Sequence, residues 1–218
     1  MREFYEIVSS ATEEQRQNLA ELTNSGFGGS PDVLCNHIRY LRGGSIGQLF
    51  CNTSWKQIVT DVADQVGINW SEILNDRTWD DLSTQEIEGA VVVKQFQNML
   101  EQLTPEKWQQ ILMELRRESD DPHFEGFLLS GGAMLAAEMS GFGVYLLAST
   151  VLGGLTGALG ITLPFAVYMG VSQTIAFVLG PVGWAALAGG VLFSLNQTNW
   201  NRLGLSVLYI STLRHSAT

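Results

Sequence analysis

The stretch TVLGGLTGALG, residues 150–160, decides how this chain folds, because it contains four glycines and no charged side chain. A glycine inside a water-exposed helix costs about 1 kcal/mol relative to alanine, so this stretch is a poor surface helix. A loop is disfavoured as well, since loop backbone needs polar partners. Two settings remain: a helix in lipid, where irregular backbone is costlier still, and a close helix–helix contact, where small residues let backbones approach.

Charge divides the 218-residue chain around this stretch. Of the 12 basic and 22 acidic side chains, only Glu138, Arg202 and Arg214 come after residue 125. A change of this kind indicates different surroundings for the two parts. The fold class that we predict is all-α, in three parts: an acidic soluble helical domain at 1–125, a glycine-rich apolar helical hairpin region at 126–198, and a closing helix or tail at 199–218.

The first part carries the start and stop signals of several short helices. Thr12 is placed as an N-cap, and Ser83 and Glu86 have the spacing of a capping box. Pro31 fits the first turn of a helix, and glycines follow the apolar periodicity where helices end. These signals predict helices that begin after Thr12, at Pro31, near Ser54, after Ser83 and at Pro105, with stops near Gly26, at Gly43 and Gly44, and at Gly67.

The apolar region is long enough to cross a bilayer. Residues 141–163 contain no charge, and a helix needs about 20 apolar residues to cross the hydrocarbon core. Residues 174–195, kinked at Gly180-Pro181, form a second candidate crossing. Because basic residues favour the cytoplasmic side, arginines on both flanks indicate an even number of crossings, with the N-terminal domain and the C-terminal tail in the cytoplasm. The flanking arginines are Arg116, Arg117, Arg202 and Arg214.

A permanently soluble core is the alternative for the same residues. Helices at the surface of a soluble protein need polar outer faces, and residues 126–195 offer few polar side chains. The first 125 residues would then have to wrap the apolar part completely. A third arrangement lies between these two, in which a soluble protein hides an insertable hairpin until it meets a membrane.

Small residues recur at helical spacing along the apolar region, and such stripes are typical of close helix–helix contacts. We predict that they mediate self-association of the hairpin. The stripes comprise Ser149, Gly153 and Gly157; Ala133, Ala137 and Gly141; Ala185 and Gly189; and Ala186, Gly190 and Ser194.

Glu138 is the acid of this region, and two roles are open for it. An acid within a membrane can serve as a proton- or ion-sensitive switch. The simpler interpretation places Glu138 just outside the first crossing, near the lipid headgroups.

The chain resembles the uncharacterised bacterial YaaW-type family, which is grouped with the ubiquinol–cytochrome c chaperone domain. The resemblance rests on the turn from Gly43 to Ile46, on IVTDVADQVGI at 58–68, on TQEIE at 84–88, and on GPVGWAALAGG and LSVLYISTLR near the C-terminus. It covers most of residues 35–214 with motifs of low specificity. It implies an all-helical fold and a role in assembling membrane complexes, and it brings no catalytic residues.

Enzymatic, metal and nucleic-acid functions find no support in the sequence. RGGSIG lacks the Lys-Ser/Thr of a phosphate-binding loop, and there is no G-x-S-x-G motif. Cys35 and His37 lack the further ligands of a zinc site, so a packed pair is the simpler interpretation. A net charge of −10 disfavours binding to duplex nucleic acid, because phosphate contacts need Lys and Arg. We expect no cofactor, no catalytic residue and no metal.

Two functional hypotheses follow. The first is a non-enzymatic, membrane-associated protein that anchors or inserts through its hairpin, self-associates, and by extension permeabilises or remodels the bilayer. Its partners are then the lipid bilayer, other copies of the chain, and a protein bound by the acidic N-terminal domain. The second is a soluble all-helical assembly chaperone for a membrane complex. The start MREFYEIVSS lacks the apolar run of a secretory signal, and two cysteines suit a reducing compartment.

Overall fold

Capping residues begin the helices at the positions that the sequence indicates. Thr12 and Gln15 form a reciprocal capping box at the start of α2, which spans Glu13–Thr23. The Ser54 side chain accepts from the Gln57 amide at the start of α4, Trp55–Gln65. Ser83 and Glu86 exchange hydrogen bonds at the start of α6, Thr84–Leu100. These contacts satisfy amides that have no partner within the helix, and those at Thr12 and Ser83 confirm the predicted caps.

The computed structural model describes residues 1–26, 28–50, 53–74, 76–100, 144–145, 147–152 and 198–216, with 104–106, 109 and 113 besides. Within these residues the secondary structure is entirely helical, which confirms the all-α class. The remaining elements are α1 (Arg2–Ser10), α3 (Pro31–Phe50), α5 (Trp70–Leu74), the short 3-10 helix η1 (Trp79–Asp81) and α11 (Thr198–Ser216).

Helix α3 is interrupted where the sequence predicts a stop. Gly44 has φ 63° and ψ −164°, a backbone conformation that side chains with a Cβ rarely adopt. The regular helix that begins at Pro31 therefore ends there. Helix α4 likewise ends before Gly67, as predicted.

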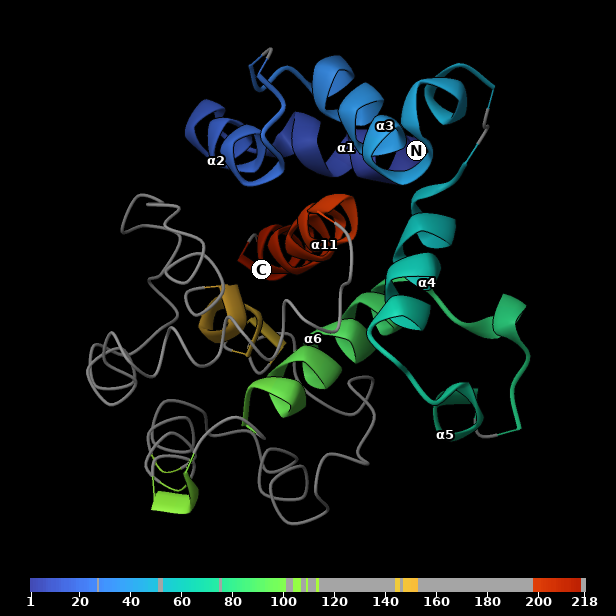
Figure 1. Cartoon of the computed structure of the whole chain (residues 1–218), viewed down its shortest axis with the longest axis vertical. Coiled ribbons are helices and arrows are strands. Elements are labelled where there is room, and N and C mark those ends of the chain that lie inside the picture. The colour runs from blue at the N-terminus through green and yellow to red at the C-terminus, as the bar shows by residue number, and fades with distance from the viewer. Residues whose placement is uncertain are drawn as a thin grey trace.

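Helix α11 lies at the centre of the described bundle (Figure 1). It packs against α1, α2 and α3 on one side and against α4 and α6 on the other, while α5 lies at the periphery. Residues 203–213 of α11 are all buried. A helix that is buried all round is a core helix, so the segment at the C-terminal end of the chain closes the bundle that the N-terminal helices begin.

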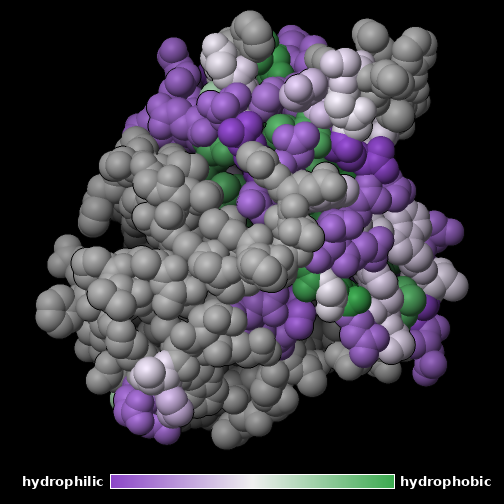
Figure 2. Space-filling view, viewed as in Figure 1, coloured by the Kyte–Doolittle hydropathy of each residue, from purple (hydrophilic) through white to green (hydrophobic). Residues whose placement is uncertain are grey.

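The core of this bundle is formed by large apolar side chains from both ends of the sequence. The Phe4 and Trp55 rings have centroids 4.8 Å apart. Tyr209 of α11 is buried, and its hydroxyl donates to the Gln15 carbonyl at 3.0 Å. Hydrophilic and intermediate residues cover most of the described surface on the face that Figure 2 draws. The N-terminal helices thus have the polar outer surface that a bundle in water needs.

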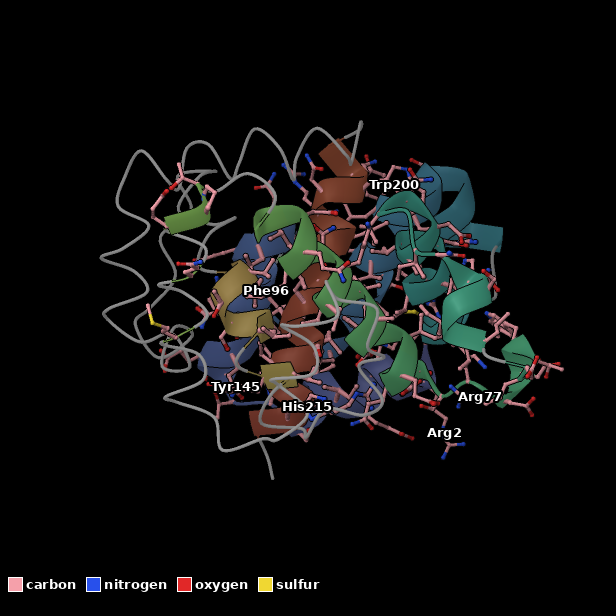
Figure 3. The ribbon with its side chains drawn as sticks, turned by 90° about the horizontal axis from the view of Figure 1, so that it is seen from below. Arg2, Arg77, Phe96, Tyr145, Trp200 and His215 are labelled. Carbon is pink, nitrogen blue, oxygen red and sulfur yellow. The ribbon has the colours of Figure 1, made fainter. Side chains whose placement is uncertain are left out.

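Part of the apolar region also belongs to this core. Residues 147–152 are helical and buried, and they share one hydrophobic cluster with α6 and α11. Figures 1 and 3 both draw this short gold segment beside α6 and α11. Among the described residues, no helix is both long and apolar enough to cross a bilayer. Most of the predicted crossing at 141–163, and all of that at 174–195, lie outside those residues.

Candidate functional site

A cluster of charged side chains lies where α1, α6 and α11 meet. Arg214 of α11 donates from Nε and Nη2 to both carboxylate oxygens of Glu88 on α6, each at 2.9 Å. Its Nη2 also donates to Glu3 Oε1 of α1 at 2.9 Å. A guanidinium fits a carboxylate with two parallel hydrogen bonds, so this contact fixes the angle between α6 and α11 as well as their separation.

Glu88 has a third hydrogen-bond donor, which comes from α4. The Trp55 Nε1 donates to Glu88 Oε1 at 2.6 Å, while the Trp55 ring packs on Phe4. The Glu88 side chain is 1% exposed and the Arg214 side chain 20%. Thr84 donates to Glu3 Oε2 at 2.8 Å and so orients the second acid of the cluster. Helices α4 and α11 therefore meet α6 at the Glu88 carboxylate, and α1 joins them through the contact of Glu3 with Arg214.

Burial controls the ionisation of this cluster. Loss of water raises the pKa of the Glu88 carboxyl, and the hydrogen bonds and charge of Arg214 and the Trp55 indole lower it without fully offsetting that effect. Burial and the neighbouring Arg214 charge lower the pKa of His215. Figure 3 shows His215 and Trp200 at opposite ends of α11, so the charged cluster lies at the C-terminal end of the core helix.

The cluster joins helices and has the features of a structural site. Its acids are engaged by Arg214, Trp55 and Thr84, which leaves neither of them positioned as a free general base. Within the described residues, no group of three or more His, Cys, Asp or Glu could hold a metal ion. What this arrangement can do is hold α11 against α1, α4 and α6.

Cys35 is buried and His37 half-buried on α3. Cys35 is buried, and burial raises the pKa of its thiol to about 11. His37 Nε2 lies 2.9 Å from the Thr23 carbonyl oxygen, and its ring stacks near that of Tyr40. Each of the two side chains thus has its own packing contacts in the bundle.

The structure describes three of the predicted site residues. Arg214 is paired inside the bundle, and Arg202 accepts the Ser206 hydroxyl through its backbone carbonyl. Ser149 is 0% exposed, and its hydroxyl has no hydrogen-bond partner within the part of the chain that the structure describes. The other predicted residues lie outside the described part of the chain: Gly153, Gly157, Ala185, Ala186, Gly189 and Gly190 of the stripes, with Ala133, Ala137, Gly141 and Ser194; the acid Glu138; and the flanking Arg116 and Arg117.

Sequence reasoning missed Glu88 and its pairing with Arg214. The signal for Glu88 is its position, because Val91, Val92 and Phe96 follow it at helical spacing on the buried side of α6. An acid on an apolar face indicates a buried acid that needs a cation. The identity of that cation is not a local property, since Arg214 is 126 positions away.

Comparison with protein-family models, with curated proteins and with solved structures finds no match to this chain. The resemblance to the YaaW-type family therefore stays a prediction.

Proposed function

We propose that this protein is a non-enzymatic, membrane-associating protein that inserts the apolar segment 126–198 into a bilayer as a helical hairpin. The observation that carries this proposal is that α11 closes the bundle begun by α1–α6. The chain that contains the apolar segment is thus joined to the bundle at both ends, by α6 before it and by α11 after it. Any crossing it makes must be matched by a return crossing, which is the topology that the flanking arginines favour.

The bundle is, in this proposal, the cytoplasmic part of the protein. Its polar surface and the net charge of −10 suit a water-facing domain that binds a protein partner. The small-residue stripes that include Gly153, Gly157, Ala185, Ala186, Gly189 and Gly190 provide contacts for self-association of inserted hairpins. Glu138 then lies near the headgroups, at the edge of the first crossing.

The proposal is tested with the untagged full-length chain in cells. Membranes are isolated and washed with alkaline carbonate, and the protein in pellet and supernatant is quantified. An inserted hairpin stays in the pellet and is released by detergent. Complete release by carbonate as a monodisperse species would contradict insertion.

A soluble assembly chaperone is the second candidate, and one observation favours it. Residues 147–152, within the first predicted crossing, are buried in the core of the bundle. A soluble protein would bury the rest of the apolar segment in the same way. The carbonate experiment distinguishes the two, because the chaperone remains in the supernatant.

A further inference from the structure

Six successive residues at the start of the first predicted crossing are buried on every side. Leu147, Ala148, Ser149, Thr150, Val151 and Leu152 are each 0–1% exposed. Successive residues of an α-helix point about 100° apart, so six of them cover the whole circumference. The segment therefore lies within the protein interior, with no water-facing stripe of the kind found on a surface helix.

Several buried polar atoms, in this segment and in the bundle, have no hydrogen-bond partner among the described residues. The Ser149 hydroxyl has no hydrogen-bond partner, and the same is true of Gln95 Oε1 on α6 and the Ser211 hydroxyl on α11. By contrast, Ser206 of α11, equally buried, donates to the Arg202 carbonyl at 2.7 Å. A buried polar group without a partner destabilises the arrangement that buries it. Apolar contacts hold the segment in the core. Release of the segment would let water or another polar group bond to the Ser149 hydroxyl.

We infer that the bundle stores residues 147–152 in its core as an autoinhibitory contact, and that insertion begins when this segment is withdrawn. This inference rests on the proposed function and adds its regulation. Withdrawal frees Ser149, the first residue of the stripe that continues to Gly153 and Gly157, so self-association follows insertion. The bundle and the bilayer compete for one segment of the chain.

The test is the substitution Ser149→Ala in the full-length protein. Removing an unpaired buried hydroxyl stabilises the stored state, so the rate of insertion into vesicles of phosphatidylcholine and phosphatidylglycerol falls about fivefold or more. Transfer to lipid alone predicts the opposite, because alanine is more apolar than serine. The sign of the rate change therefore separates storage from simple partitioning.

Ser206→Ala is the matched control, since this hydroxyl is as buried as that of Ser149 but already paired. It should not slow insertion. A nitroxide label at Tyr145→Cys, with Cys35 and Cys51 replaced by alanine, follows the segment directly. Tyr145 is half-buried and lies two residues before the segment. On insertion the label gains access to oxygen but not to a water-soluble nickel complex.

Two results would overturn the inference in distinguishable ways. If the label reaches lipid and Ser149→Ala inserts as fast as the unmodified protein or faster, storage is wrong and the proposed function stands. If the label of the otherwise unmodified protein stays shielded from oxygen with vesicles present, insertion itself is wrong and both fail.

Discussion

Arg214 brings together two acids that lie far apart in the sequence. It contacts Glu3 near the N-terminus and Glu88 in the middle of the chain, and it does so from the last turn of α11. Buried ion pairs add little net stability, because desolvation offsets their attraction, but removing one partner is costly. The pair thus specifies the position of α11 more than it strengthens the bundle.

Arg214→Met should reduce the free energy of unfolding by about 3 kcal/mol, because it leaves the Glu88 carboxyl buried without its cation. The double variant Glu88→Leu/Arg214→Met should recover most of this loss, since neither charge then remains. Urea unfolding of the single and double variants measures both values. A double variant that is less stable than Arg214→Met would contradict this interpretation.

The contribution of Glu88 to the free energy of unfolding should decrease as pH rises. Its folded-state pKa is raised by burial, so its contribution to stability is present at acid pH and lost as pH rises through the folded pKa. Glu88→Gln lacks this loss. The stability of Glu88→Gln relative to the unmodified protein should therefore rise from about pH 4 to about pH 8.

Glu86, on the same helix, is the control with the opposite sign. Partial burial raises the pKa of the Glu86 carboxyl, but hydrogen bonds from Ser83 and Arg77 outweigh it and the net pKa is lowered. Its contribution is present above the unfolded pKa and lost as pH falls through the folded pKa. The relative stability of Glu86→Gln should fall over the same rise in pH. Equal slopes for the two variants would refute the assignment.

At the scale of the element, the sequence predicts where helices begin and end but not how they meet. Thr12, Pro31, Ser83 and Gly44 act through neighbours within four residues, so their roles are visible in the local pattern. The contact of Tyr209 with Gln15 and that of Arg214 with Glu88 depend on packing across the whole chain. Periodicity identifies α11 as apolar on most faces, but only the arrangement of the other helices makes it central.

Gly29 shows how closely two elements approach. A Cβ built on Gly29 would lie 2.9 Å from the carbonyl carbon and oxygen of Arg16, which are backbone atoms of α2. Gly29→Ala should therefore destabilise the protein by about 1–3 kcal/mol, because the backbone has to move. Gly43→Ala is the control: a Cβ there meets nothing within 4 Å, and alanine stabilises a helix by up to about 1 kcal/mol. Thermal melting followed by circular dichroism should show shifts of opposite sign.

At the scale of the whole molecule, the bundle depends on a helix that lies beyond the apolar segment. α11 contacts α1, α2, α3, α4 and α6, so without it these helices lose the element that they share. The domain boundary after residue 125 stays a prediction. In the structure, however, the central helix on which α1–α4 and α6 pack is α11, from the C-terminal part of the sequence. The composition of residues 203–213 does not predict that α11 is the central helix of the bundle, because a membrane-facing helix has the same apolar character.

Truncation after Gln197, which removes α11, should abolish cooperative unfolding of the remaining chain. Truncation after Ser216 removes residues that follow α11 and should leave the transition unchanged. Circular dichroism during urea titration, with detergent present for both variants, gives the measurement. A sharp transition in the shorter variant would show that the N-terminal helices form a core by themselves.

The central position of α11 has a consequence for the order of events during translation. A ribosome adds about 5–20 residues per second, so the whole of 126–197 is made before α11 is complete. During that interval the N-terminal helices have no central helix to pack on, and the newest part of the chain is its most apolar part. The nascent protein thus carries its glycine-rich segment outside a completed bundle until α11 has been synthesised.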